Sequence, residues 1–147
     1  PVIAGSIEDI RGTIKKYNAK VLCNCSEKIN ADIDSQLLRE ALINLLENAI
    51  KYGDNNSSVT LAVKEKSNNI LIDIGNTGSI IPKKEHDRIF NRFYRVDKSR
   101  SKKTGGTGLG LAIVKHISFV HNGTIEVKKS DEISTVFRFT LPKNISN

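Results

Sequence analysis

Apolar residues recur at intervals of three and four in three stretches of the chain, a period that predicts amphipathic helices. Short helices are expected over residues 6–17 and 109–121. The longest helix begins after Asp34, a residue type that caps helices well, and is stopped by Gly53. Its apolar stripe consists of Leu38, Leu42, Leu45 and Ala49.

Alternating apolar and polar residues predict strands, because successive side chains of a strand point to opposite faces. The alternation is clearest in two segments joined by Ser67-Asn68, which we expect to form a hairpin turn. In chain order, strands are expected over residues 20–25, 59–66, 69–75, 124–129 and 134–141. Helices and strands together predict an α+β fold, a two-layer sandwich in which a mixed, mostly antiparallel sheet packs on about three helices.

The remaining segments are irregular. Residues 76–82 form a loop in this prediction, and a short helix covers about 83–90. Residues 91–108 are polar, basic and rich in glycine, and such a long irregular stretch inside a compact domain is usually functional or mobile. The predicted organisation is an N-terminal helix over 1–19, a domain over 20–142 and a tail over 143–147.

The composition favours one soluble globular domain. The chain has 147 residues, of which 38% are hydrophobic and 27% charged. No apolar run approaches the roughly 20 residues of a membrane span, and no signal peptide is visible. Because the sequence begins with Pro, we expect a piece of a longer protein. The net charge of +7 indicates either a negatively charged partner or simply a basic surface.

The two cysteines, Cys23 and Cys25, fall in the first expected strand and point to the same face of it. They are poorly placed to form a disulfide with each other, and no Cys or His lies nearby at a zinc spacing. We expect them to be small buried residues with free thiols, which suits a reducing cytosol.

Three polar residues of the long predicted helix share one face. Asn44, Asn48 and Lys51 are spaced four and three positions apart, about a quarter turn from the apolar stripe. A polar stripe so close to the core is expected to line a cleft, although an ordinary solvated face would show the same spacing. Amide oxygens are acceptable ligands for Mg²⁺, and a Lys suits a phosphate oxygen.

Four glycines fall within the six residues 105–110, directly before a helical pattern. Glycine allows backbone N–H groups to approach an anion closely, and a helix N-terminus adds partial positive charge. These are the properties of a phosphate-binding loop, and a flexible linker is the alternative. The pattern is neither a P-loop nor a dinucleotide-binding fingerprint.

Basic and aromatic residues are interleaved between Arg88 and Lys103, a segment with seven basic residues and one acidic residue, a net charge of +6. Three interpretations fit: a surface for single-stranded nucleic acid, a cationic lid over a polyphosphate, or a solvated loop with Phe90 and Phe93 in the core. The glycine-rich segment lies next to this charge and favours the lid.

Earlier in the chain, Asn76 and Gly78 follow a strand, where a polar side chain and a bare backbone suit a flat base.

Four segments, in this order, resemble the N, G1, F and G2 boxes of the catalytic ATP-binding domain of sensor histidine kinases. They are NLLENAIKY, the segment Ile74–Pro82, RIFNRFYRVD and GGTGLGLAIVK. This family is grouped with the gyrase and heat-shock chaperone ATPases. The resemblance covers residues 34–142 and implies a Bergerat-type ATP-binding fold. It also implies transfer of the γ-phosphoryl group of Mg²⁺–ATP to a His on a separate domain.

The resemblance implies a role for each matched residue. Asn48 would coordinate Mg²⁺, with Asn44 beside it. Lys51 would contact phosphate, and Tyr52 would pack near the ribose or adenine. Arg95 would stabilise the transferring phosphoryl group, so that Asn44, Lys51 and Arg95 are the catalytic candidates.

The resemblance further implies that residues 91–108 form an ATP lid, with Tyr94 and Arg95 near the phosphates. The glycines would provide its hinge and its phosphate contacts. The other implied nucleotide-binding positions are Gly106, Thr107, Gly108, Leu109, Gly110, Leu111 and Ile81.

One departure from the family concerns adenine recognition. The G1 box usually begins with an Asp whose carboxylate accepts the adenine amino group, and here that position is Asn76, followed by Gly78. An amide oxygen still accepts this hydrogen bond, but without charge assistance, which predicts weaker binding. The alternative alignment keeps an acid, Asp73, but leaves it inside a strand and needs three extra residues before Ile81. We prefer Asn76.

Two absences bear on the reaction. The related ATPases carry a Glu four residues before the metal-binding Asn, and here that residue is Asn44, which favours phosphoryl transfer over hydrolysis. His86, His116 and His121 lack the family's phospho-acceptor context, so this chain is not expected to phosphorylate itself.

The resemblance also implies partners and a location. The partners are a dimerisation domain and a response regulator. The whole protein would be a membrane-anchored homodimer, with this domain at the cytoplasmic face of the cell membrane.

Two other functions fit parts of the pattern. A serine-type kinase of the same fold, of the kind that controls sigma factors, would share the nucleotide site, but the extended lid argues against it. A nucleic-acid-binding module using the lysines of residues 98–103 would bind oligonucleotides without Mg²⁺–ATP. The expected partners therefore include a nucleotide and no nucleic acid.

Overall fold

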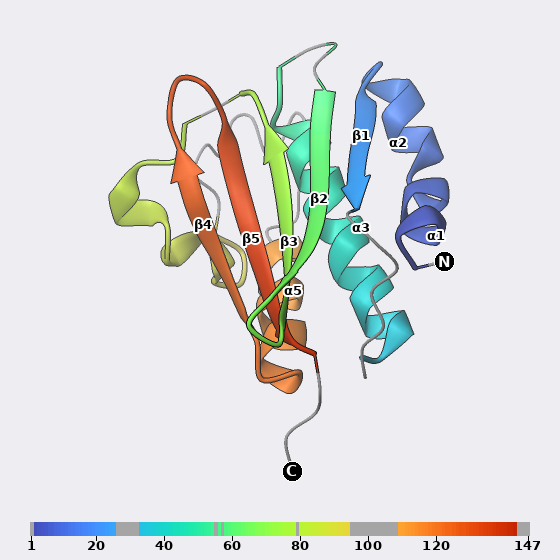
Figure 1. Ribbon diagram of the computed structural model, residues 1–147. Coiled ribbons are helices and arrows are strands. Elements are labelled where there is room, and N and C mark those ends of the chain that lie inside the picture. The colour runs from blue at the N-terminus through green and yellow to red at the C-terminus, as the bar shows by residue number, and fades with distance from the viewer. Residues whose placement is uncertain are drawn as a thin grey trace.

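The computed structural model describes residues 2–25, 33–54, 56, 58–78, 80–94 and 109–143. It has two layers, a five-stranded sheet and a set of helices packed on one of its faces, as Figure 1 shows. The predicted α+β sandwich is therefore confirmed. No helix in the described ranges is both long and apolar enough to cross a membrane.

The sheet is mixed, and its strands lie in the order β1-β2-β3-β5-β4. β1 pairs in parallel with β2, and the other three pairings are antiparallel. The strand bounds, within one residue of those expected, are β1 Lys20–Cys25, β2 Ser58–Lys66, β3 Asn69–Asn76, β4 Thr124–Ser130 and β5 Thr135–Pro142. The strand β1 at one edge thus has a single neighbouring strand in the described sheet.

The helices are α1 Val2–Asp9, α2 Arg11–Lys16, α3 Ser35–Lys51 and α5 Gly110–Val120. The single helix expected over 6–17 is in fact two, because the backbone leaves helical geometry at Ile10 (φ −102°, ψ 15°). That break lets the Ile10 side chain, 1% exposed, enter the core. The expected helix over 83–90 consists of two 3₁₀ turns, Lys83–Glu85 and Arg88–Phe90.

The core lies between the helix layer and the facing side of the sheet. The expected stripe of α3 is largely correct, since Leu42, Leu45 and Ala49 are buried and Leu38 packs on the core from its edge. The apolar residues of β2, β3 and β5 alternate as expected, so the side chains at every second position enter this core. Positions of the sheet between them face away from the helices.

Local signals fix the ends of α3 and α5. The Asp34 carboxylate accepts a hydrogen bond from the Leu37 N–H at 3.0 Å, so the expected N-cap is confirmed. The Asp34 N–H donates to Nε2 of His121, 3.3 Å away, which joins the start of α3 to the end of α5. The two hairpin residues Ser67 and Asn68 have φ of 50° and 65°, as a tight type I′ turn requires.

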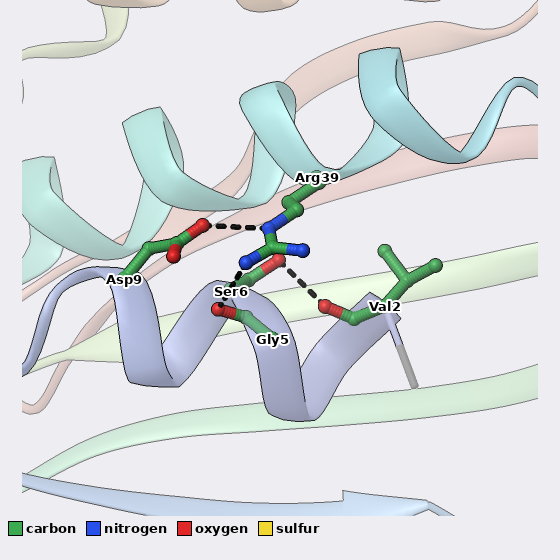
Figure 2. Close-up of polar contacts among 5 residues, drawn as sticks. All are labelled: Val2, Gly5, Ser6, Asp9 and Arg39. Atoms are coloured by element: carbon green, nitrogen blue, oxygen red, sulfur yellow. Dashed lines mark hydrogen bonds and ion pairs between the residues drawn. The ribbon is translucent and has the colours of Figure 1, made fainter.

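A salt bridge holds α1 against α3 (Figure 2). Arg39 of α3 donates to the Asp9 carboxylate at 2.6 Å and to the Gly5 carbonyl oxygen at 3.3 Å. The hydrogen bond from Arg39 lowers the pKa of the Asp9 carboxyl group. Beside them the fully buried Ser6 hydroxyl donates to the Val2 carbonyl oxygen at 2.8 Å, which satisfies its polar group inside the helix.

The cysteines differ from the expectation. Cys23 and Cys25 are exposed rather than buried, and their sulfur atoms lie 3.6 Å apart. The reason is the position of β1 at the edge of the sheet, where neither the helices nor a second neighbouring strand covers the side chains.

Candidate nucleotide site

The end of α3 and the loop that follows β3 are joined by backbone contacts. Gly53 and Gly78 form an isolated antiparallel bridge, and the Asp54 N–H donates to the Thr77 carbonyl oxygen at 2.7 Å. A Cβ atom on Gly78 would collide with the Tyr52 carbonyl oxygen and lie 2.8 Å from the Gly53 Cα atom. Only glycine fits here, so the two segments singled out in the sequence form one rigid unit.

The start of α5 contacts α3 at Asn44, on the polar face of that helix. The side chain of Asn44 donates to the Glu40 carbonyl oxygen at 2.9 Å, which fixes the amide on its own helix. Its Oδ1 then lies against Gly110, where an added Cβ atom would come within 3.0 Å. Residues 66 positions apart in sequence therefore meet, and the positive end of the α5 dipole lies beside the polar stripe of α3.

Asn48 and Lys51 complete that stripe. Asn48 is partly buried, and its side-chain amide has no hydrogen-bond partner within the described ranges. The Lys51 ammonium lies 3.4 Å from the Glu47 carboxylate, with 27% of the Lys51 side chain exposed. The stripe thus offers an uncommitted amide oxygen and a half-shielded cation, which suit a cation–phosphate ligand.

The amide oxygen of Asn48 fits a magnesium ion that arrives with phosphates. No group of three or more His, Cys, Asp or Glu side chains gathers in the described part of the chain, so a cage made only of protein ligands is lacking there. Mg²⁺ commonly keeps several waters and bridges a few protein oxygens to substrate phosphates. One neutral amide ligand at the side of a phosphate site is compatible with that mode of binding.

Asn76 lies at the end of β3 and is 6% exposed. It shares the face of Ile72 and Ile74, so its side chain points toward the helix layer. Its amide makes one long hydrogen bond, from Nδ2 to the Thr77 carbonyl oxygen at 3.5 Å, among the residues that the structure describes. A buried amide with this much unused bonding capacity is suited to a polar ligand.

Asp73, the alternative acid, faces the other side of the sheet. Its carboxylate accepts two hydrogen bonds from Arg138, at 2.8 and 2.9 Å, and lies 3.5 Å from the Lys128 ammonium. Burial raises the pKa of this carboxyl group, but the hydrogen bonds and charge of Arg138, with Lys128, outweigh burial and lower the pKa overall. Asp73 is committed to this ion pair, which favours the alignment on Asn76.

The other described candidates surround the same region. Ile81, Tyr94 and Leu111 are partly buried and pack against the core. Tyr52 caps the C-terminus of α3, with its N–H donating to the Asn48 carbonyl oxygen at 3.1 Å. Leu109 occupies the N-cap position of α5. Arg95, Gly106, Thr107 and Gly108 lie outside the described residues.

Three residues outside the predicted site anchor the loop after β3, namely Ser130, Thr135 and His86. The Ile81 N–H donates to the Ser130 hydroxyl at 2.8 Å, and that hydroxyl lies 2.7 Å from the hydroxyl of Thr135. His86 donates through Nε2 to the Ile81 carbonyl oxygen at 2.9 Å. A register shift between Val127 and Lys129 in β4 brings Ser130 opposite Thr135. The hydrogen bond from Ile81 to Ser130 joins residues 49 positions apart, so the local pattern gave no signal for it.

The two phenylalanines of the basic segment differ in burial. Phe90 is buried and packs edge-to-face on Phe137, with ring centres 6.1 Å apart. Phe93 is 69% exposed and has a φ of 63°, a conformation that is strained for a bulky side chain. The interpretation with both rings in the core is therefore wrong for Phe93.

Comparison with known proteins gives a consistent result. The model of the histidine kinase-, DNA gyrase B- and HSP90-like ATPase family matches residues 33–145. The sensor-like histidine kinase SenX3 of Mycolicibacterium smegmatis is 43% identical over 110 residues, which cover 75% of this chain and 29% of SenX3. The heme sensor protein HssS of Staphylococcus aureus is 45% identical over 118 residues, 80% of this chain and 25% of HssS. The chain thus spans about a quarter of the length of these curated relatives.

Solved structures of histidine kinases share this fold. The nucleotide-free catalytic domain of histidine kinase ThkA has a TM-score of 0.83 at 25% identity, covering 97% of this chain and 91% of that one. Full-length ShkA in complex with AMPPNP has a TM-score of 0.80 at 22% identity, covering 99% and 30%. ThkA in complex with the response regulator TrrA has a TM-score of 0.79 at 23% identity, covering 97% and 39%.

Gly53, directly after the N segment, bridges to Gly78 of the G1 segment, and Asn44 of the N segment contacts Gly110 of the G2 segment. The family model spans all of these residues. The chain therefore belongs to the histidine kinase-, DNA gyrase B- and HSP90-like ATPase family, and within it to the ATP-binding catalytic domains of sensor histidine kinases.

Proposed function

We propose that this chain binds Mg²⁺–ATP between α3, the loop after β3 and the start of α5, and transfers the γ-phosphoryl group to a His of a separate domain. The observation that carries the proposal is the contact of α3 with two other segments, since Asn44 meets Gly110 and Gly53 meets Gly78. This arrangement supports one site made of the polar stripe of α3, the loop after β3 and the N-terminus of α5. ShkA, which shares the fold, was solved with the ATP analogue AMPPNP.

Adenine is recognised at the buried end of this site. The Asn76 amide oxygen accepts the exocyclic amino group of adenine, and the bridge between Gly53 and Gly78 fixes the backbone beside it. The anchors of Ile81 through Ser130 and His86 support this role, because they hold the loop in place before ligand arrives. Tyr52, Ile81 and Leu111 provide the apolar borders.

The phosphates lie along the α3 stripe. Lys51 contacts phosphate oxygens and exchanges part of its pairing with Glu47 for them. Asn48 would hold Mg²⁺, which when bound neutralises phosphate charge. The N-terminus of α5 at Gly110 adds backbone N–H groups directed at an anion. Tyr94, Arg95, Gly106, Thr107 and Gly108 complete the phosphate end in this proposal.

The chemistry favours phosphoryl transfer over hydrolysis. At the position where related ATPases have a water-activating Glu, Asn44 has a neutral amide that donates to its own helix and cannot accept a proton from water. The nearby Glu47 is paired with Lys51 on the surface of α3. The attacking group is therefore the imidazole of an acceptor His, positioned by another domain.

The whole protein is, in this proposal, a membrane-anchored homodimeric sensor kinase that passes the phosphoryl group to a response regulator. The support is the identity to SenX3 and HssS over a quarter of their lengths and the complex of ThkA with TrrA. The described histidines do not offer an acceptor context, since His86 and His121 are held by backbone contacts and His116 lies on the exposed side of α5.

Calorimetric titration tests the nucleotide function against the nucleic-acid alternative. AMPPNP with Mg²⁺ is titrated into the chain, and a single-stranded oligonucleotide is titrated in parallel at two salt concentrations. We expect one saturable, Mg²⁺-dependent site for the nucleotide and no tight oligonucleotide binding. Oligonucleotide binding that is strongly salt-dependent, without a nucleotide site, would replace this function with a nucleic-acid-binding one.

A further inference from the structure

The two exposed cysteines form a compact pair of thiols on the edge strand β1. Cys23 and Cys25 stand two positions apart, so both side chains project from the same face of the strand, and the side chain of Asn24 projects from the other. Their sulfur atoms are 3.6 Å apart, and both residues are exposed. This pair is not part of the nucleotide site, whose residues come from α3, β3 and α5.

The sulfur separation fits a shared metal ion better than a disulfide. Two thiolates at about 2.3 Å from one tetrahedral ion stand about 3.8 Å apart, close to the observed 3.6 Å. A disulfide needs about 2.05 Å between the sulfurs. Two residues of an extended strand also lie about 6.4–6.8 Å apart at Cα, the far end of the range that a disulfide spans.

The surroundings leave the pair accessible, since both thiols are free and exposed. A metal ion that binds the pair must displace the thiol protons, as thiol ligands generally require.

We propose that Cys23 and Cys25 form a two-thiolate site for a soft divalent metal ion of the zinc type, with water in the remaining coordination positions. In the described part of the chain no third His, Cys, Asp or Glu joins them in a cluster. Thiolates select zinc and similar soft ions over Mg²⁺. The site is thus chemically distinct from the proposed magnesium position at Asn48.

The test is a titration of Zn²⁺ into the reduced chain, free of any purification tag, followed by calorimetry. One ion per chain is expected. Cys23→Ser and Cys25→Ser should each weaken binding by at least about tenfold, since loss of a mere outer-shell partner already costs 10–100-fold. Asn24→Ser, a change on the same strand but the opposite face, is the matched control and should leave the affinity unchanged.

A second measurement identifies the ligand atoms independently of affinity. Cd²⁺ bound by thiolates produces a charge-transfer absorption in the ultraviolet, and it should appear with the parent chain and with Asn24→Ser but not with the double Cys→Ser variant. Circular dichroism of each variant confirms that the fold is retained. Zn²⁺ binding of equal strength in the double variant would overturn the proposal. So would an intact mass two hydrogens lower after purification without reductant, with no metal uptake, because the pair would then form a disulfide.

Discussion

Asn76 shows how one side chain sets the expected strength of nucleotide binding. Its amide is buried and nearly unused in the described structure, and the neighbouring backbone is fixed by the Gly53–Gly78 bridge. A neutral acceptor forms a weaker hydrogen bond than a carboxylate would. The affinity of this domain for ATP is therefore expected to be limited by the chemistry of Asn76 and not by its position.

Replacing Asn76 tests that role. Asn76→Ala should weaken binding of AMPPNP about five- to tenfold, the equivalent of one neutral hydrogen bond of about 1–1.4 kcal/mol. Asn76→Asp should strengthen it, because the hydrogen bond becomes charge-assisted. Calorimetry provides both values, and the exposed Asn24→Ala serves as the control. Unchanged affinity in Asn76→Ala would remove this residue from adenine recognition.

Gly78 is the second residue whose identity the structure explains. Gly78→Ala places a methyl group against the Tyr52 carbonyl oxygen and the Gly53 Cα atom, so the bridge must open. We expect a loss of about 1–3 kcal/mol in the free energy of unfolding, and AMPPNP affinity reduced at least about tenfold. Urea unfolding and calorimetry measure the two effects.

Gly12 provides the matched glycine control. It lies in α2, and a Cβ atom there would have no neighbour within 4 Å. Gly12→Ala should leave nucleotide affinity unchanged and stabilise the fold by up to about 1 kcal/mol, the helix propensity difference. If Gly78→Ala behaved like Gly12→Ala, the tight contact between the two segments would be disproved.

At the scale of elements, the sequence predicted the strands and helices well where hydrophobic period and capping agree. Asp34 begins α3, and Ser67-Asn68 turn the hairpin as expected. The errors have a common cause, which is tertiary contact. The break at Ile10 accompanies the burial of that side chain, and the exposure of Cys23 follows from the edge position of β1. Neither condition is present in the local sequence.

The candidate site divides in the same way. Asn44, Asn48, Lys51 and the glycines were recognised from spacing and from the family resemblance. The support from Ser130 and Thr135 was not, because it depends on a register shift in β4 and on the pairing of β4 with β5. Helix patterns thus indicate candidate ligand-binding residues, whereas the contacts that anchor the loop after β3 emerge only from the sheet topology.

The solvent side of the sheet has a pH-dependent element. Arg138 and Lys128 lower the pKa of Asp73 in the folded chain despite its partial burial. A depressed carboxyl pKa stabilises the fold above the unfolded pKa of about 3.9, and this contribution is lost as the pH falls through the folded value. Asp73→Asn should cost about 1–3 kcal/mol at neutral pH and much less near pH 3.

Urea unfolding at both pH values measures this difference. Asp87→Asn, which alters an exposed carboxylate with no ion pair in the described ranges, is the control and should show little pH-dependent change relative to the parent chain. An Asp73→Asn variant that loses as much stability on acidification as the parent would contradict the linkage.

At the scale of the whole molecule, the net charge of +7 is concentrated in one segment of the chain. Residues 88–103 account for +6 of it. In the sequence this segment directly precedes the glycine-rich residues that lead into α5. Membership in an ATP-binding family makes a local counter-charge to a triphosphate the better explanation of this excess than a nucleic-acid footprint.

The isolated chain should bind ATP without labelling itself. Incubation with ATP labelled at the γ-phosphate and Mg²⁺ should leave no stable label on the protein, because no described histidine has an acceptor context. A chain supplied with its dimerisation domain should become labelled under the same conditions. Stable label on the isolated chain would show that an acceptor lies within these 147 residues.

The bridge between Gly53 and Gly78 has a thermodynamic consequence for ligand binding. It joins the loop after β3 to the end of α3, so the two segments proposed to hold the base and the phosphates belong to one preassembled body. The translational and rotational entropy of the ligand is then lost once for two sets of contacts, and no ordering of this junction is required. Adenosine and triphosphate, offered as separate molecules, should therefore bind far more weakly together than the covalent nucleotide does.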